Sequence, residues 1–171
     1  MTNRTVLYGI GVSAGTASGP LAVVRPAVGV DDSEPAAVEG DSERVKAALQ
    51  EVAESLKQRA EHANSATSKQ VLEATATLAT DRGLIRGIEK ELKKGTGVTH
   101  AIHDAVEVYA GKLRKLGGYM AERVTDLYDI RDRATARVRG LPEPGVPDFA
   151  EPSILVAHDL CLLYTSDAAD E

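Results

Sequence analysis

The sequence predicts a mainly α-helical protein in which a bundle of four to five helices is inserted between short β-strands. The chain has 4% aromatic residues and no Trp, and its many Ala, Leu, Val, Glu, Lys and Arg residues favour helices that pack through small and aliphatic side chains. Between positions 41 and 139, apolar residues recur at the spacing of one helix face. Short apolar runs typical of strands flank this region at both ends.

The first 40 residues are expected to form two strands and a connection. Residues 5–11 and 18–25 are short apolar runs, and the Gly- and Ser-rich segment 12–17 between them indicates a turn. Residues 27–40 are charged and lack apolar periodicity, so they are predicted to be a solvated connection that ends at a helix start.

The first helix is expected to be capped by Asp41 or Ser42 and to run for about six turns. Its buried stripe is predicted to consist of Val45, Leu49, Val52, Leu56 and Ala63. A second helix is expected to begin between Ser65 and Ser68 and to break between Thr80 and Gly83.

The remaining helices follow the same logic. A short third helix over residues 84–92 is predicted to stop near Gly95, and Thr99 is expected to cap the fourth helix, which ends at Gly117. The last helix is predicted to run from Tyr119 to Gly140, and its buried stripe consists of Met120, Val124, Leu127, Ile130, Ala134 and Val138. A Pro-containing linker then precedes a return strand over residues 153–157.

Composition excludes several classes of protein. The net charge of −6 and a pI near 5.3 argue against nucleic-acid binding and favour a basic partner protein. No apolar run approaches the roughly 20 residues that cross a bilayer, and the start of the chain lacks a signal-peptide core. We therefore expect a cytoplasmic protein that does not bind membranes.

Residues 161–171 show no apolar period and no recognisable turn sequence, and a genuine carboxyl end is the alternative to the following interpretation. This string resembles the translation of a sequencing adapter, and such scars are excluded from fold reasoning. The natural sequence is expected to stop at Leu160, and the single cysteine, Cys161, is given no role.

The glycines at the start of the chain allow a rival enzymatic interpretation. Gly9, Gly11 and Gly15 fit a dinucleotide-binding fingerprint, with Asp31 or Asp32 at about the expected distance. That fingerprint requires a helix directly after the glycines, whereas Pro20 and the apolar run after it predict a strand.

Four segments of the chain carry distinctive motifs. They are the glycine-rich segment 9–19, the helical segment 71–84, the acidic and basic segment 121–132 (Ala-Glu-Arg-Val-Thr-Asp-Leu-Tyr-Asp-Ile-Arg-Asp) and the return strand with its His-Asp-Leu, 154–160. In order and spacing they resemble the amino-terminal region of Enzyme I, the phosphoenolpyruvate-protein phosphotransferase of the bacterial sugar phosphotransferase system. Together these matches extend over nearly the whole chain before the tail.

The resemblance implies a division into parts. Residues 1–30 resemble the first strands of an α/β phosphohistidine subdomain, and residues 141–160 resemble its linker and return strand. Residues 41–140 resemble the inserted helical subdomain that docks the histidine-containing phosphocarrier protein (HPr). In the family, phosphate passes from phosphoenolpyruvate to a histidine of the enzyme and then to HPr for sugar uptake.

The same resemblance implies that this chain alone is inactive. The family's catalytic histidine lies in a Gly-Gly-x-x-Ser-His-Thr motif that does not occur here, so no catalytic residue is expected. The phosphoenolpyruvate site, its Mg²⁺ ligands and the dimer contacts belong to a carboxyl-terminal domain further on, so the chain is expected to be a monomer without cofactors. Its four histidines, His62, His100, His103 and His158, are interpreted as ordinary histidines without a catalytic role.

Five residues match the family's HPr-facing helices: Glu73, Leu78, Asp81, Leu84 and Arg123. The acids are expected to meet a basic rim on HPr while apolar side chains fill the centre of the contact. The helical spacing leaves Leu78 and Leu84 open between core and surface. Thr75, Thr77 and Gly83 depart from the family's pattern, which predicts a smaller docking surface. A purely structural helical adaptor remains the alternative.

Overall fold

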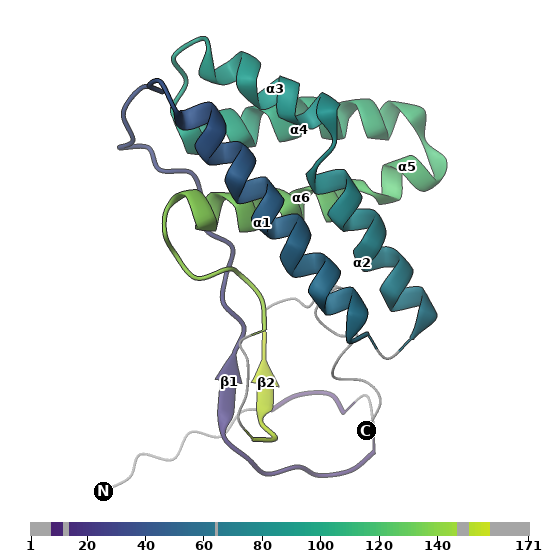
Figure 1. Ribbon diagram of the computed structural model, residues 1–171. Helices are drawn as coiled ribbons and strands as arrows, with labels where there is room; N and C mark the ends of the chain where they lie inside the picture. The colour runs from purple at the N-terminus through teal and green to yellow at the C-terminus, as the bar shows by residue number, and fades with distance from the viewer. Residues whose placement is uncertain (1–7, 12–13, 64, 147–150, 158–171) are drawn as a thin grey trace, which may run out of the picture.

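The computed structural model describes residues 8–11, 14–63, 65–146 and 151–157. This part of the chain is mostly helical, as the sequence predicts, with two short strands (Figure 1). In chain order the elements are β1 (Leu21–Val23), α1 (Asp41–Glu61), α2 (Ala66–Ala79), α3 (Arg82–Leu92), α4 (Val98–Leu116), α5 (Gly118–Glu122), α6 (Val124–Val138) and β2 (Ile154–Val156).

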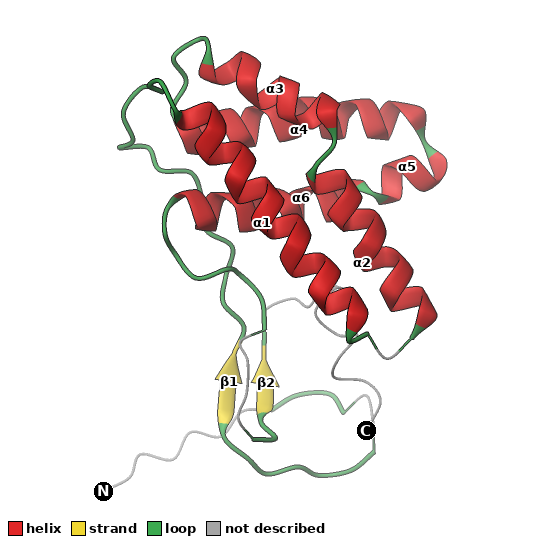
Figure 2. Cartoon of the chain, viewed as in Figure 1, coloured by secondary structure: helices red, strands yellow, loops and turns green. Residues whose placement is uncertain are grey.

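The helices form one body and the two strands lie apart from it, joined to it by two extended connections (Figure 2). β1 and β2 pair in parallel, with Leu21 opposite Ile154 and Val23 opposite Val156. All six helices therefore lie between two strands that are neighbours in space. This arrangement agrees with the insertion that the sequence predicts.

The core of the bundle is aliphatic. Residues of α1, α2, α3, α4 and α6 form one cluster, in which Val52, Leu56, Ile102 and Leu127 are fully buried. The predicted stripe of α1 is confirmed from Val45 to Leu56. The predicted cap of α1 is wrong, because the helix follows Gly40, while the Asp41 carboxylate accepts a hydrogen bond from the Val38 N–H at 2.8 Å.

Both ends of α2 lie where the sequence predicts them. The Ser65 hydroxyl caps the helix by accepting a hydrogen bond from the Ser68 N–H at 3.1 Å. The chain then turns at Thr80, and the Asp81 side chain caps α3. The predicted break between Thr80 and Gly83 is therefore confirmed.

The start of α4 is held by a residue that lies far away in the sequence. The prediction that Thr99 caps this helix is wrong, because Thr99 is buried in the first turn. Instead, the Glu34 carboxylate accepts hydrogen bonds from the N–H groups of Thr99 at 2.9 Å and His100 at 3.0 Å. A side chain at Gly97 would overlap this carboxylate. The connection before α1 is thus fastened to the bundle.

Glu34 and His100 also form an ion pair, with 3.0 Å between Oε1 and Nδ1. Burial acts to raise the pKa of Glu34, but its bonds with Thr99 and His100 outweigh burial and hold that pKa below the ordinary value. The bond to Glu34 raises the pKa of His100, although burial opposes it. Asp32 lies 3.4 Å from the other ring nitrogen of His100 and acts in the same direction.

The last predicted helix is in fact two. The short helix α5 ends at Glu122, and α6 begins at Val124 after a turn at Arg123. Met120, predicted on the buried face, is 45% exposed, and α5 contains no buried residue. The remaining members of the predicted stripe, from Val124 to Val138, are buried.

Charged residues tie the connection after α6 to the bundle. Arg133 is 2% exposed and donates from Nε to Asp129 at 2.7 Å. Glu143 accepts from Arg133 at 2.8 Å and from Arg137 at 2.7 Å. The two connections are also joined to each other, because Arg139 forms an ion pair with Asp31 at 3.6 Å.

The predicted strand over residues 5–11 is not found in the described part, since residues 8–11 are exposed and form no strand, and residues 1–7 lie outside the described residues. Residues 161–171 also lie outside them. Among the described helices, none has the length and apolar character needed to cross a bilayer.

Candidate functional site

The corner between α2 and α3 brings together several of the residues singled out from the sequence. Oδ1 of Asp81 accepts hydrogen bonds from the N–H groups of Gly83 at 2.7 Å and Leu84 at 3.0 Å, and from the Tyr109 hydroxyl at 2.9 Å. Burial acts to raise the pKa of Asp81, but these three bonds outweigh it, so the carboxyl stays ionised. Asp81 therefore fixes the corner and joins it to α4.

Tyr109 fills the space that a side chain at position 83 would need. A Cβ added to Gly83 would lie 3.2 Å from the Tyr109 ring and 2.9 Å from the Asp81 carboxylate. Burial and the neighbouring Asp81 raise the pKa of Tyr109 to about 12, so its hydroxyl remains a donor. A glycine at position 83 therefore leaves the space that the Tyr109 ring of α4 occupies.

Arg123, at the turn between α5 and α6, makes the second link across this end of the bundle. Its guanidinium forms an ion pair with Asp126 at 2.6 Å and donates to the Thr75 hydroxyl of α2 at 3.4 Å. The same group lies over the Tyr119 ring, 5.7 Å from its centroid. Burial raises the pKa of Asp126 although Arg123 opposes this effect. Arg123 therefore holds α2, α5 and α6 together.

Exposed apolar residues lie on the elements that these two links join. Four residues of α4 and α5 have large exposed fractions: Val108 (59%), Leu116 (71%), Tyr119 (62%) and Met120 (45%). Val108 adjoins Tyr109 in α4, and Tyr119 stacks on Arg123, which contacts α2 one turn before Leu78. We call this set, together with Leu78, the docking face. Exposed apolar side chains on neighbouring helices are candidates for an interaction site.

The five predicted site residues occupy different environments. Glu73 is exposed and Leu78 is half-buried against the core. Asp81 and Arg123 hold the helices together, as described above. Leu84 is 1% exposed and belongs to the core, so its match to the family's contact residues does not place it on a surface. The sequence left Leu78 and Leu84 open, and the structure separates them.

Sequence reasoning missed the apolar residues of α4 and α5. Val108 and Leu116 lie outside the buried stripe of α4, and Leu116 directly precedes the two glycines that end the helix. Their position outside the buried stripe, and for Leu116 its place next to the helix end, could have indicated from the sequence that they are exposed. Leu116 is followed by the turn at Gly117, where φ is 69° and the chain changes direction.

Residues 8–123 match the protein family described as PEP-utilising enzyme, N-terminal. The chain belongs to this family. The resemblance to Enzyme I that the sequence suggests is thereby confirmed. The matched region begins in the glycine-rich segment and ends at Arg123, so it includes the whole docking face.

Individual members of the PEP-utilising enzyme family are similar over most of the chain. A phosphoenolpyruvate-protein phosphotransferase of Streptomyces coelicolor is 38% identical over 162 residues, which are 92% of this chain and 29% of the relative. The corresponding protein of Listeria monocytogenes is 26% identical over 161 residues, or 90% of this chain and 28% of the relative. The chain thus spans less than a third of the length of these relatives.

Solved structures share the fold of this family member. A solution NMR structure of an Enzyme I protein matches with a TM-score of 0.66 and 24% identity, over 86% of this chain and 63% of that one. The N-terminal domain of a nitrogen Enzyme 1 matches with a TM-score of 0.59 and 18% identity, over 81% and 58% of the two chains. The predicted fold class, a helical bundle with short strands, is therefore confirmed.

The described residues do not fit a metal site of the kind that the family implies elsewhere. They contain no group of three His, Cys, Asp or Glu side chains placed to hold an ion. His100 is paired with Glu34 and Asp32, and His62 is exposed with its Nδ1 2.8 Å from the Gln58 carbonyl oxygen. His103 lies beside Asp104, and His158 lies outside the described residues. No step that involves a metal follows from this part of the chain.

The dinucleotide interpretation lacks its structural requirement. Residues 14–20 form no helix, and the next element is the strand β1. Gly9, Gly11 and Gly15 are exposed, so the described segment offers no helix N-terminus to a pyrophosphate.

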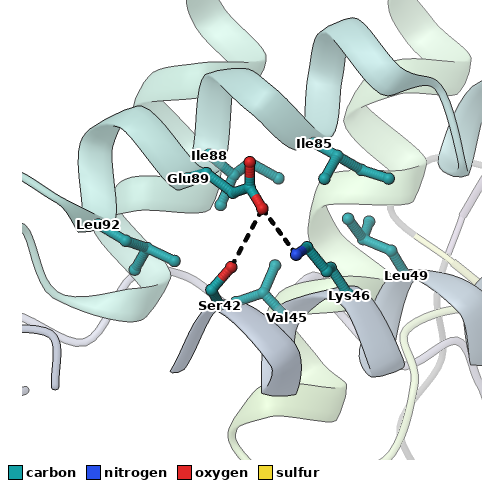
Figure 3. Close-up of a pocket in the computed structure, with 8 residues that line it drawn as sticks. All are labelled: Ser42, Val45, Lys46, Leu49, Ile85, Ile88, Glu89 and Leu92. Carbon is teal, nitrogen blue, oxygen red and sulfur yellow. Dashed lines mark hydrogen bonds and ion pairs between the residues drawn. The ribbon is translucent and has the colours of Figure 1, made fainter. Parts of the chain in front are cut away.

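A pocket between α1 and α3 has polar groups that are already paired (Figure 3). It is lined mainly by aliphatic residues of both helices. At its rim, Glu89 forms an ion pair with Lys46 at 2.7 Å and accepts a hydrogen bond from Ser42 at 3.3 Å. This pocket therefore explains how α1 and α3 pack rather than offering a site.

Proposed function

We propose that this chain is the HPr-docking part of a phosphoenolpyruvate-protein phosphotransferase of the bacterial sugar phosphotransferase system. In this proposal residues 41–140 bind HPr in the cytoplasm, and residues 1–30 and 141–160 begin the α/β subdomain that carries the phosphohistidine in the parent protein. The parent transfers phosphate from phosphoenolpyruvate through that histidine to HPr. Docking is the contribution of this chain.

The docking face is the observation that carries the proposal. Leu116 and Tyr119 are the most exposed of its members, and they lie on either side of the turn that joins α4 to α5. Aromatic and aliphatic side chains at the centre of an interface contribute most of its binding energy when a partner covers them. Membership of the family and similarity to phosphotransferases support HPr as that partner.

The links behind the docking face explain how it is kept in one shape. The Tyr109–Asp81 hydrogen bond joins α4 to the α2–α3 corner, and Arg123 joins α2 to α5 and α6. Side chains that are held before binding lose less conformational entropy when a complex forms. In the proposed function, the chain binds the carrier and orients it, while other parts of the parent transfer the phosphate.

Calorimetric titration with purified, unphosphorylated HPr, for example from Streptomyces coelicolor, tests the proposal. The chain should bind, and Leu116→Asp should weaken binding by about tenfold or more, since it places a charge in the apolar centre. Val38→Asp is the matched control, because Val38 is 69% exposed but lies before α1, outside the docking face. If no heat of binding appears at high micromolar HPr, the docking proposal fails and a structural helical adaptor becomes the better account.

A further inference from the structure

The carboxyl end of α6 carries three arginines that the docking function does not use. Arg133 and Arg137 lie in the last two turns of the helix, and Arg139 is its cap residue. Each of them contacts one of the two connections that lead from the bundle to the strands. We call the stretches of these connections that lie nearest the strands the neck, which consists of residues 24–31 and 141–145.

Arg139 holds the part of the neck that leads to α1. Its guanidinium donates to the Gly29 carbonyl at 2.9 Å and forms an ion pair with Asp31 at 3.6 Å. The Asp31 N–H in turn donates to the hydroxyl of Thr99, in the first turn of α4, at 2.9 Å. Residues 29–31 are therefore tied to α6 and α4, although neither helix is next to them in the chain.

Glu143 holds the part of the neck that follows α6. Its carboxylate accepts a hydrogen bond from Arg133 at 2.8 Å and another from Arg137 at 2.7 Å. Arg137 also donates to Glu51 of α1 at 2.7 Å, so its guanidinium is itself held in place. A carboxylate that accepts from two guanidiniums is fixed in direction as well as in position.

The two parts of the neck are also paired with each other, on the strand side of these contacts. The N–H of Arg25 donates to the Gly145 carbonyl and the N–H of Gly145 donates to the Arg25 carbonyl, both at 3.0 Å. On one side a single residue, Pro144, separates this bridge from Glu143, and its ring fixes φ. On the other side three residues separate the bridge from Gly29. The neck therefore has little length in which to bend.

The bundle does not need these pairs for its core, which is aliphatic. Arg133 is 2% exposed, and desolvation offsets much of the attraction in a buried ion pair, so apolar side chains of similar size would stabilise the fold about as well. An ion pair supplies a fixed geometry in addition. The strands lie apart from the helices (Figure 2), and parts of a chain that share no large apolar interface move relative to each other by default. A restraint at the neck is therefore what these arginines add.

We infer that the carboxyl end of α6 is an ionic clasp, which holds the neck and the strand pair beyond it in one direction relative to the bundle and opens when its pairs are broken. Arg139 clasps one part of the neck, and Arg133 and Arg137 clasp the other through Glu143. Ion pairs at a joint can be exchanged while the parts on either side keep their own structure. The clasp thus gives the joint a closed state of fixed direction and an open state in which the bundle is free to turn.

Distances between two spin labels, measured by double electron–electron resonance in the full chain, test the clasp. One label is attached at Ala47→Cys, exposed on α1, and the other at Ala27→Cys, exposed in the neck, after the single cysteine has been removed by Cys161→Ser. The chain with an intact clasp should give one narrow distribution of distances. Arg139→Gln and Glu143→Gln should each broaden this distribution, and the two changes together should broaden it further.

Arg131→Gln is the matched control. Arg131 also lies on α6, but it pairs with Asp132 of the same helix at 2.7 Å. Its substitution removes the same charge and should leave the distance distribution unchanged. Thermal midpoints followed by circular dichroism report on the bundle, and Arg139→Gln should leave the midpoint nearly unchanged because its ion pair with Asp31 is partly exposed. A broader distribution in that variant would then reflect the joint and not the fold.

Three results would overturn the clasp. The first is a broad distribution while the clasp is intact, and the second is a distribution that stays narrow when Arg139→Gln and Glu143→Gln are combined. The third is a lower thermal midpoint with unchanged distances, which would mean that the arginines only stabilise the bundle. The distances are measured without HPr, so their outcome is independent of the proposed docking function.

Discussion

The helical bundle and the strand pair bury their apolar residues to very different extents. In the bundle, apolar residues such as Leu56 and Ile102 are fully buried. In the strand pair, Leu21 and Val23 of β1 are 68% and 59% exposed, and Ile154 and Val156 of β2 are 38% and 45% exposed. A sheet of two short strands is marginal without a further layer. The bundle therefore has what it needs to be stable, and the strand pair does not.

The largest expected effect is a loss of stability when an apolar side chain of the bundle, but not of the strand pair, is shortened. Leu56→Ala should lower the free energy of unfolding by about 2 to 5 kcal/mol, since it leaves a cavity among α1, α2 and α6. Val23→Ala in β1 should change it by less than about 0.5 kcal/mol, because Val23 is mostly exposed. Urea unfolding followed by circular dichroism measures both.

Hydrogen exchange checks the same contrast without substitution. Amides of β1 and β2 should exchange far faster than those in the middle of α1 and α4. Equal protection in the two regions, or equal costs of Leu56→Ala and Val23→Ala, would contradict the difference in stability.

A second prediction tests whether the connection before α1 stabilises the helical bundle. Glu34→Gln should destabilise the bundle by about 2 kcal/mol near pH 6, because it weakens the charged hydrogen bonds at the start of α4. The pKa of Glu34 is lower in the folded chain than its ordinary value of 4.5. The Glu34 carboxylate therefore contributes its full stabilisation above pH 4.5, and this stabilisation is lost as the pH falls through the lower folded pKa.

The contribution of His100 to stability changes with pH in the opposite direction. The pKa of His100 is higher in the folded chain than its ordinary value of 6.5. Its contribution to stability is therefore fully present below pH 6.5 and is lost as the pH rises through the higher folded pKa. The difference in unfolding free energy between the original chain and Glu34→Gln should therefore be largest between about pH 5 and 6.5. Urea midpoints measured from pH 3 to 9 provide the test, and a difference that does not vary with pH would count against the Glu34–His100 pair.

The smallest expected changes in unfolding free energy come from substitutions at two glycines, one in each region. Gly83→Ala should cost about 1 kcal/mol in spite of the better helix propensity of Ala, because its Cβ meets Asp81 and the Tyr109 ring. In a Tyr109→Ala background the cost of the same change should fall, because only the contact with Asp81 remains. Gly19→Ala, whose Cβ would lie 3.1 Å from the Pro152 oxygen beside the strand pair, should cost less. Unfolding free energies of the single and double variants form the cycle, and an equal cost of Gly83→Ala in both backgrounds would remove Tyr109 as the cause.

Sequence reasoning identified the elements that depend on local signals. The start of α2 at Ser65 and the break before α3 at Asp81 were predicted because each is capped by its own nearby side chain. The start of α4 was misassigned because its capping oxygens come from Glu34, which lies 65 residues away from Thr99. A cap of that kind is formed only by the tertiary structure.

The candidate site was predictable in part for the same reason. The spacing along α3 left Leu84 open between core and contact surface until its packing in the bundle was known. The turn at Arg123 was missed because apolar spacing continues from Met120 into α6. The ion pairs of Glu89 with Lys46 and of Glu91 with Lys94 depend on how these side chains turn, which the sequence alone does not determine.

The most direct test of the account is an NMR titration of the ¹⁵N-labelled chain with unphosphorylated HPr. Amide shifts should change at Leu78, Val108, Leu116 and Tyr119, while those of Val23 and Leu155 in the strand pair stay unchanged. Shifts centred on the strand pair or on α1, with none at the α4–α5 turn, would contradict the docking function assigned to this face of the bundle.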